Sequence, residues 1–219
     1  MPGVAISASY GTGGTYIARR TADQLGFRLL DRAISSRVAE QLHVSEEEAE
    51  TGVIKRSPVK RFFRILAPLT GEVIDTDDDD VPDTLVPHDA GIFRTATEAI
   101  MREALSGGAV ILGRAASAAL RYETGILRVR LFGSAEARIA QAAWLEGAEA
   151  KEAAKRLPEA DRARALYVRR LYDRDIDDPD LYHMQIDSTV LPLDDCARII
   201  TLAYTAMCQA SHTAEPPVP

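Results

Sequence analysis

The stretch VAISASYGTGGTYIARRTADQL, residues 4–25, contains the local pattern that decides the fold. A short apolar run over residues 4–7 leads into a segment with glycine at positions 11, 13 and 14. Beyond the glycines, apolar side chains recur at helical spacing, at Ile17, Ala18, Ala22 and Leu25. The pattern predicts a strand, a glycine loop and a helix. A loop of this kind leaves backbone N–H groups at the helix N-terminus that can bind a phosphate, although a tight turn without any ligand has the same local pattern.

The same alternation continues along the chain. Gly26 is placed to end the first helix, and residues 27–30 form a second apolar run that leads into Asp31 and a helix over 33–42. Two successive β-α units predict a parallel sheet. Further strands are predicted over 109–112, 127–132 and 182–186, and further helices over 90–105, 135–145, 148–172 and 194–208.

Composition divides the chain into a core domain, 1–44 and 89–210, and an insertion, 45–88. The insertion contains acidic runs, a basic segment and prolines at 58, 68, 82 and 87. It is interpreted either as an acceptor-side subdomain or as a solvated, mobile excursion, because its Asp-rich part cannot bury a core. The charged segment over about 148–180 is interpreted as a mobile lid, and the proline-rich tail, 211–219, is expected to be disordered.

The overall composition excludes several classes of protein. Of the 219 residues 46% are hydrophobic and 27% charged, and the net charge is −7, which argues against coating nucleic acid or lying on a membrane. Two cysteines, Cys196 and Cys208, are too few for a disulfide framework or a zinc site. No apolar run approaches the roughly 20 residues of a membrane span, so a cytoplasmic protein is expected. A homodimer is compatible with the sequence, but no apolar stripe demands one.

The glycine segment matches a known phosphate-binding pattern in part. Against G-x-x-x-x-G-K-[ST], the P-loop pattern, residues 8–15 match at Gly13 and Thr15. Ala8 stands at the first glycine and Gly14 at the lysine. This segment alone therefore leaves phosphate binding and a simple turn open.

Nearly the whole chain outside 45–88 resembles the cytidylate kinase-like family of P-loop proteins. The matching segments follow one another in order, at residues 6–18, 30–32, 110–114, 128–139, 161–167 and 187–191. The resemblance implies a P-loop NTPase-like three-layer α/β/α fold with a five-stranded parallel sheet. It also implies ATP and Mg²⁺ as cofactors and small-molecule nucleotides as binding partners.

The resemblance further implies which residues form the site. The ATP phosphates would lie on Gly11, Thr12, Gly13, Gly14 and Thr15, with Thr15 also binding the metal, and the acceptor would lie on Asp31, Arg32 and Arg114. The expected catalytic positive charge comes from Arg114 and the lid residues Arg162, Arg164, Arg169 and Arg170, because phosphoryl transfer depends on positioning and positive charge. Each lid arginine has an alternative interpretation as a solvated helix residue with i,i+4 partners.

Two departures from the family weaken the case for catalysis. Gly14 replaces the lysine that bridges donor phosphates, and Leu112 and Ala115 replace acidic residues beside Gly113 and Arg114. The leading hypothesis is an ATP-dependent nucleoside monophosphate kinase, with cytidylate as the default acceptor. The alternatives are a nucleotide- or phosphate-binding protein with little turnover, and a P-loop kinase that acts on another small acceptor.

Overall fold

A computed structural model describes residues 2–31, 37, 40, 42 and 87–213. Arg32, most of the predicted helix 33–42, residues 45–86 of the predicted insertion and the last six residues lie outside this description. Within the described part, the structure has no helix long and apolar enough to span a bilayer.

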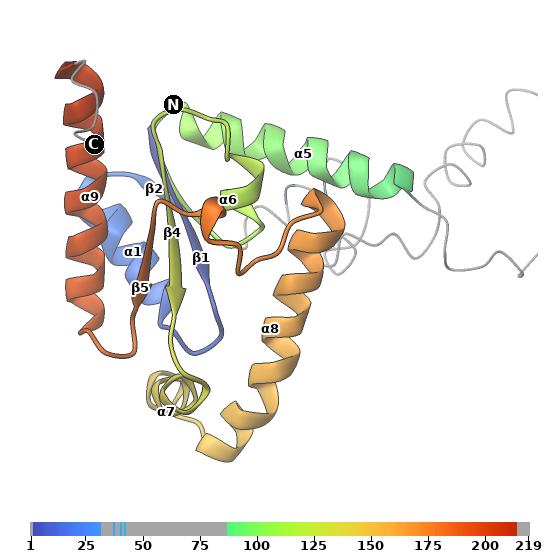
Figure 1. Ribbon diagram of the computed structural model, residues 1–219, viewed down its shortest axis with the longest axis vertical. Coiled ribbons are helices and arrows are strands. Elements are labelled where there is room, and N and C mark those ends of the chain that lie inside the picture. Colours follow the sequence, from blue (N-terminus) through green and yellow to red (C-terminus); the bar gives the residue numbers. More distant parts are fainter. Residues whose placement is uncertain (1, 32–36, 38–39, 41, 43–86, 214–219) are drawn as a thin grey trace, which may run out of the picture.

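The centre of the structure is a five-stranded sheet in which every strand pairs in parallel (Figure 1). The strands follow the spatial order β2-β3-β1-β4-β5. Their bounds are Gly3–Ala8 for β1, Arg28–Leu30 for β2, Ala109–Leu112 for β3, Ile126–Phe132 for β4 and Met184–Asp187 for β5. The predicted five-stranded parallel sheet is therefore confirmed.

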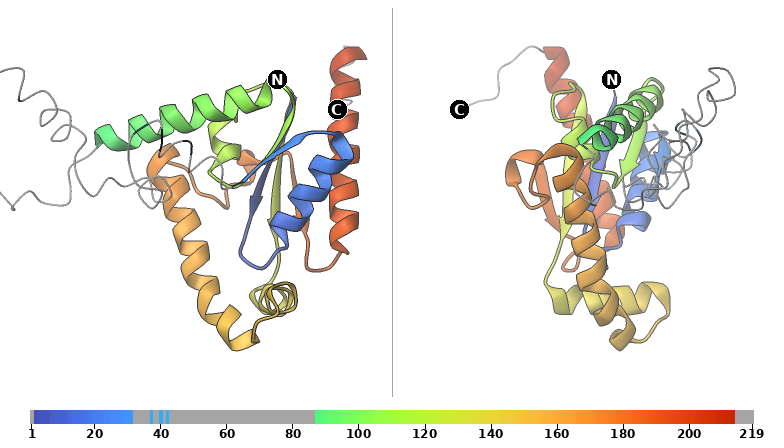
Figure 2. Two further views of the ribbon diagram at one scale, coloured as in Figure 1. Left: turned by 180° about the vertical axis from the view of Figure 1, so that it is seen from behind. Right: turned by 90° about the vertical axis from the view of Figure 1, so that its right-hand side faces the viewer.

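Helices cover both faces of the sheet and complete three layers (Figure 2). On one face lie α1 (Gly14–Leu25) and α9 (Leu193–Thr213), which pack against each other as well as on the sheet. On the other face lie α5 (Pro87–Leu105), α6 (Ala116–Ala119) and α8 (Ala150–Tyr172). The remaining helix, α7 (Ala135–Glu146), lies beyond the carboxyl end of β4 (Figure 1).

The alternating sides of each strand explain the two cores. Val4 and Ile6 of β1 face α1 and α9, whereas Ala5 faces the opposite core with Phe93 of α5, and all are buried. Helix α1 presents Ile17, Ala18 and Ala22 to the sheet, as its helical spacing predicts. Removal of these side chains from water on both faces provides the main driving force for folding.

This topology brings the glycine loop to the point where the direction of winding reverses. The chain leaves β1 toward β2 on one side, and after β3 it crosses β1 to reach β4 on the other side. In open α/β sheets, ligands bind beyond the carboxyl ends of the strands at this point. Residues 9–13, between β1 and α1, occupy it.

Several element boundaries differ from the sequence predictions. Helix α9 continues to Thr213, into the segment expected to be a disordered tail, and α5 begins at Pro87, inside the predicted insertion. Proline is compatible with the first turn of a helix, where its missing N–H has no intrahelical acceptor. The short helices α6 and η1 (Pro179–Leu181) were not predicted because three or four residues are too few to show a period.

Candidate functional site

The loop between β1 and α1 is a compact turn in which the glycines adopt left-handed backbone geometry. Gly11 has φ of 80° and Gly13 has φ of 69°, values that disfavour residues with a side chain. Thr12 between them is fully buried, and its hydroxyl donates to the carbonyl oxygen of Ser9 at 2.7 Å. The side chain of Thr12 therefore stabilises the turn from inside, and its backbone N–H also donates to the Ser9 carbonyl oxygen, at 3.3 Å.

Neighbouring elements hold the loop in place. A Cβ at position 11 would overlap the carbonyl oxygen of Arg138 on α7, so the loop backbone packs directly on that helix. Gln141 of α7 donates to the Gly11 carbonyl oxygen at 3.0 Å, and Ser188, after β5, donates to the Thr12 carbonyl oxygen at 2.8 Å. The loop is fixed from both sides before any ligand binds.

The N-terminus of α1 is left open to an anion. Gly13 is the N-cap residue, and no described side chain accepts a hydrogen bond there. The first-turn N–H groups, beginning at Gly14, have no intrahelical acceptor, and the helix dipole favours negative charge at this end. Such an end binds phosphate or carboxylate oxygens.

Ala8 and Gly14, the two departures from the P-loop pattern, are in contact with each other. A Cβ built on Gly14 would lie 2.5 Å from the Cβ of Ala8, which is much closer than two carbon atoms approach without a bond. Because the methyl group of Ala8 is attached directly to the backbone, it cannot rotate away. Position 14 therefore excludes a lysine as long as position 8 holds alanine.

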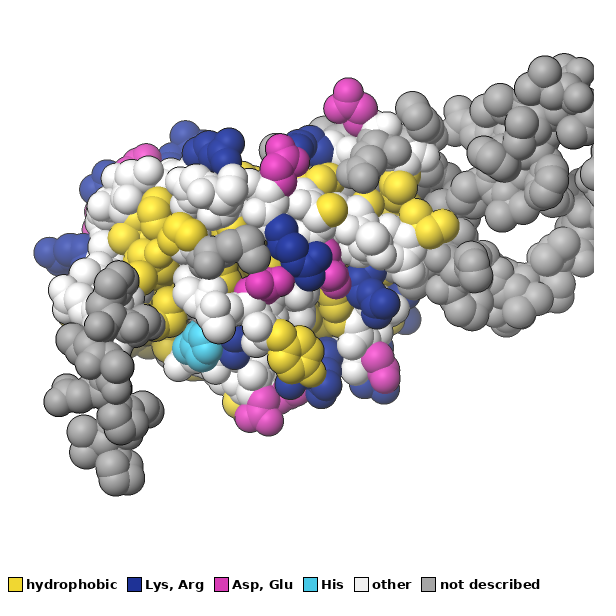
Figure 3. Space-filling view, turned by 90° about the horizontal axis from the view of Figure 1, so that it is seen from above, with side chains coloured by type: hydrophobic (Ala, Val, Ile, Leu, Met, Phe, Trp, Pro, Cys, Tyr) yellow, Lys and Arg dark blue, Asp and Glu magenta, His cyan; other side chains and the backbone are white. Residues whose placement is uncertain are grey.

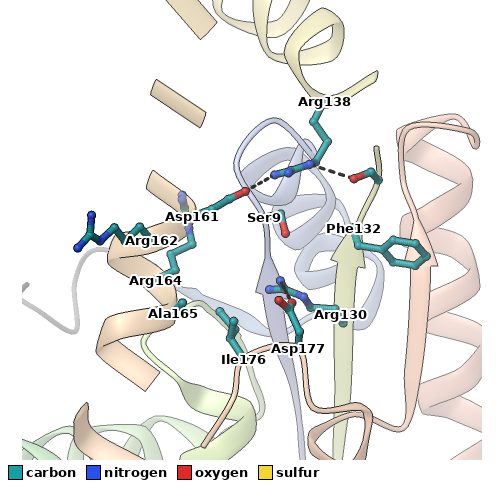
Figure 4. Close-up of a pocket in the computed structure, with 11 residues that line it drawn as sticks. Ser9, Arg130, Phe132, Arg138, Asp161, Arg162, Arg164, Ala165, Ile176 and Asp177 are labelled. Carbon is teal, nitrogen blue, oxygen red and sulfur yellow. Dashed lines mark hydrogen bonds and ion pairs between the residues drawn. The ribbon is translucent and has the colours of Figure 1, made fainter. Parts of the chain in front are cut away.

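A cleft of about 410 Å³ separates the loop from α8 (Figure 4). It is lined by Ser9, Arg130, Phe132, Gly133, Arg138, Asp161, Arg162, Arg164, Ala165, Ile176 and Asp177. The four arginines come from β4, α7 and α8, against two carboxylates; Arg130, Arg138 and Arg164 surround the space, whereas Arg162 extends away from it (Figure 4). An excess of positive charge in a concave site next to the glycine loop suits a ligand with several phosphates.

Asp161 connects α8, the predicted lid, to the loop. Its carboxylate accepts a hydrogen bond from the Tyr10 N–H at 3.0 Å and from Arg138 Nη1 at 2.6 Å (Figure 4). The same Arg138 nitrogen also donates to the Tyr10 carbonyl oxygen at 3.1 Å, and Arg138 Nε donates to the Gly133 carbonyl oxygen at 3.0 Å. A negatively charged group thus already lies on one loop N–H and one cleft arginine.

Arg130 lies on the floor of the cleft near the carboxyl end of β4. Its side chain is 8% exposed, and it donates to Ser7 Oγ at 2.9 Å and to Asp177 Oδ1 at 2.8 Å. Ser7 lies directly opposite Arg130 in the β1–β4 register, one residue before Ala8. The guanidinium therefore lies beneath the start of the glycine loop.

The four predicted lid arginines fall into two pairs. Arg162 and Arg164 line the cleft, although Arg162 extends away from Arg138 and Arg130 (Figure 4). Desolvation lowers the pKa of Arg164, and the positive charges of Arg130 and Arg138 lower it further against the opposing effect of Asp161. Arg169 pairs instead with Asp173 at 3.4 Å, one helical turn away, and neither Arg169 nor Arg170 lines the cleft.

Comparisons with known proteins identify the family. The sequence profile of the cytidylate kinase-like family matches residues 3–190. The chain belongs to the cytidylate kinase-like family. The match spans the loop, the cleft and α8, and family membership gives nucleotide-dependent phosphoryl transfer as the general class of chemistry. A comparison with curated proteins found no match.

Solved structures agree with this family on the fold. A protein from Eubacterium ventriosum, described as uncharacterized, is similar with a TM-score of 0.61 and 18% identity over 94% of this chain and 98% of that one. A gluconokinase from Sinorhizobium meliloti is similar with a TM-score of 0.53 and 13% identity over 98% of both chains. At these identities the similarity establishes the P-loop kinase fold and no more.

The expected acceptor residues of this family member lie elsewhere along the sheet. Asp31 follows β2 and Arg114 follows β3, and these parallel strands are neighbours, so both residues lie at the carboxyl ends of the strands. Burial raises the pKa of Tyr167 on α8, and the nearby charge of Arg114 opposes that increase. Neither Asp31 nor Arg114 lines the cleft described above, and Arg32 lies outside the described residues.

The predicted metal residue, Thr15, is exposed in the first turn of α1. Among the described residues, no three His, Cys, Asp or Glu side chains gather as a metal site. A divalent cation would accordingly rely on the Thr15 hydroxyl together with ligand phosphate oxygens. Away from the cleft, acidic and basic side chains are interspersed on the face at the amino ends of the strands (Figure 3).

Four charged residues of the cleft were not predicted as site residues: Arg130, Arg138, Asp161 and Asp177. Arg128 and Arg130 alternate with apolar residues in β4, and this period of two predicts that Arg130 points to one face near the functional end of the sheet. Arg138 lies within the segment 128–139 that resembles the family, and its position in the first turn of the helix after β4 places it near the glycine loop. Nothing local marks Asp161, because its contacts with Tyr10 and Arg138 depend on how α8 packs.

Proposed function

We propose that the protein is an ATP-dependent nucleoside monophosphate kinase with cytidylate as its default acceptor. The observation that supports this proposal is the cleft between the start of the glycine loop, at Ser9, and the arginine-bearing helix α8. The same loop ends at the open N-terminus of α1, whose N–H groups can bind phosphate. A nucleoside triphosphate, with a long anionic chain, is complementary to that arrangement.

The residues of the cleft have separate roles in this reaction. The bond between the γ-phosphorus and its bridging oxygen to the β-phosphate breaks, and a new bond forms to an oxygen of the acceptor phosphate. Gly13, Gly14 and Thr15 hold the donor phosphates through backbone N–H groups. Arg138 and Arg164 neutralise charge on the transferring oxygens, which is the main demand of phosphoryl transfer. When bound, Mg²⁺ would be held by the Thr15 hydroxyl and the phosphate oxygens and would supply further positive charge.

Helix α8 acts as the lid of this site. It reaches the loop through Asp161, and its cleft side presents Arg164. Closure of such a segment over a nucleotide excludes water, which would otherwise accept the phosphoryl group. The acceptor lies at the ends of β2 and β3 beside Asp31 and Arg114, across from the donor.

A second function follows from the glycine loop itself. The loop contains no lysine, and Ala8 prevents position 14 from accommodating one. This feature favours a protein that binds ATP and turns it over slowly or not at all. Transfer to a different small acceptor is the third alternative, because the insertion predicted over 45–88 lies outside the segments that carry the family resemblance.

A coupled assay of ADP release across all nucleoside monophosphates tests these functions. The proposal predicts release that depends on the acceptor and is greatest with cytidylate. Tight ATP binding without turnover would support the second function. ATP binding with no response to any nucleoside monophosphate, but with a response to another small hydroxyl or phosphate compound, would support the third.

A further inference from the structure

A buried arginine with a single exposed carboxylate as its ion partner lies on the floor of the cleft. The side chain of Arg130 is 8% exposed, whereas that of its partner Asp177 is 77% exposed. Charged side chains are seldom buried unless they are paired and hydrogen-bonded, because removal of an ion from water is costly. The ion partner here is an exposed carboxylate at 2.8 Å, which an incoming anion can replace.

Arg130 lies near the glycine loop, in which Gly14 stands at the position of the P-loop lysine. Arg130 Nη1 donates to Ser7 Oγ at 2.9 Å, and Ser7 immediately precedes Ala8. Ala8 is the residue whose methyl group excludes a side chain at position 14. Arg130 and Ser9 of the loop also line the same cleft. Successive residues of a strand face opposite sides, so Ser7 and Arg130 lie on the α8 side of β1, whereas Ala8 lies on the α1 side. Arg130 therefore approaches the loop from the side opposite to position 14.

We propose that Arg130 contacts the donor phosphates and supplies the positive charge that a P-loop lysine would otherwise provide. The inference rests on the proposed function, since it assigns one residue to the donor half of that site. A guanidinium held by Ser7 keeps further N–H groups free for two phosphate oxygens, which suits bidentate binding. Release of Asp177 then accompanies ATP binding.

Arg128 provides a matched control on the same strand. It lies two residues before Arg130, on the same face of β4, and donates to the carbonyl oxygens of Leu181 and Arg121 at 2.9 and 3.1 Å. It does not line the cleft. Replacement of either arginine by methionine removes a partly or fully buried guanidinium from the same surface, so a general loss of stability affects both variants.

The experiment measures the binding of ATP and of inorganic pyrophosphate by calorimetry to the full-length parent, Arg130→Met and Arg128→Met. The inference predicts that Arg130→Met weakens both ligands about 10- to 100-fold, the range for loss of a charge-assisted hydrogen bond. Arg128→Met should bind both as the parent does. Equal binding by Arg130→Met and the parent, or equal loss in the two variants, would overturn the inference.

A relocated charge separates phosphate contact from a structural role. In the Arg130→Met background, Ala8→Gly with Gly14→Lys makes room for a lysine on the loop and should recover at least about tenfold of the lost affinity, close to one charge-assisted hydrogen bond. Failure to recover any affinity in this folded triple variant would show that Arg130 acts through the packing of β4. If the parent binds neither ATP nor pyrophosphate, the proposed function fails as well, whereas parental binding that survives Arg130→Met refutes this inference alone.

Discussion

Asp161 holds the loop in a state that resembles an anion-bound one, and its replacement should make real anions bind more tightly. The carboxylate accepts from the Tyr10 N–H at 3.0 Å and from Arg138 at 2.6 Å. Arg138 lines the cleft where the donor phosphates are proposed to bind, and Tyr10 belongs to the glycine loop next to it. Asp161→Asn keeps the shape and one acceptor oxygen but removes the charge that competes with phosphate.

The size of the effect follows from the burial of the pair. The side chain of Arg138 is 11% exposed and that of Asp161 is 30% exposed, so the pair lies between a surface ion pair and a buried one. A contribution of about 1–2 kcal/mol is reasonable for such a charge-assisted contact. Asp161→Asn should therefore lower the free energy of unfolding by about 1–2 kcal/mol and tighten pyrophosphate binding by roughly 5- to 30-fold.

Calorimetric titration with pyrophosphate, combined with urea unfolding, measures both effects. Asp173→Asn is the matched control, because Asp173 pairs with Arg169 at the end of α8 and its side chain is 89% exposed. The control should change neither quantity. Weaker or unchanged pyrophosphate binding by Asp161→Asn would refute the idea that this carboxylate competes with the phosphate ligand.

Further predictions concern the loop, the acceptor, the lid and pH. Gly11→Ala should abolish ATP binding and should lower stability more than Gly26→Ala does. Both glycines have positive φ, but only at position 11 would the new methyl group overlap the backbone of another element. Equal losses of stability, of about 1 kcal/mol in thermal unfolding, would contradict this. Arg114→Lys should weaken acceptor binding by about 1–3 kcal/mol with ATP affinity unchanged, because an ammonium lacks the guanidinium fork; a large fall in melting temperature with intact acceptor affinity would make Arg114 structural. Hydrogen exchange of α8 should slow with ATP plus a monophosphate, and unchanged protection would remove the lid from the mechanism. The hydrogen bond from Arg20 lowers the pKa of Asp194. This pair therefore stabilises the folded protein above the unfolded-state pKa near 4, and the stabilisation is lost as pH falls through the lower folded-state pKa. Asp194→Asn should reduce the dependence of unfolding free energy on pH in this acid range, and an unchanged dependence would argue against the pair.

The fold could be predicted from the sequence because its signals are local. The glycine loop, the apolar strand before it and the helical spacing at Ile17, Ala18 and Ala22 all lie within one segment of the chain, and each was found in the expected element. Helix α8 was equally clear from its charged, continuous pattern over 148–172. Each such signal depends on neighbouring residues and requires no knowledge of how distant elements pack.

Only those site residues that belong to the local glycine pattern could be predicted from the sequence. Gly11 and Gly13 were identified correctly as residues of the loop, but Arg130 and Asp161 become site residues through contacts with Ser7, Tyr10 and Arg138, far away in sequence. The exclusion between Ala8 and Gly14 likewise depends on the distance from a Cβ at position 14 to the Ala8 methyl group, which no motif expresses. In the sequence, Ala8 and Gly14 are two separate departures from the P-loop pattern, whereas in the structure the first accounts for the second.

The most direct test of the proposed function follows the γ-phosphoryl group itself. Labelled ATP is mixed with cytidylate and Mg²⁺ under single-turnover conditions, with parent protein and with Arg164→Met, and labelled products are separated. The proposed function predicts label on cytidine diphosphate with the parent and about 10- to 100-fold slower transfer with Arg164→Met, as loss of one charge-assisted contact in the transition state implies. Label that stays on ATP, or appears solely as inorganic phosphate at a rate independent of any nucleoside monophosphate, would contradict it.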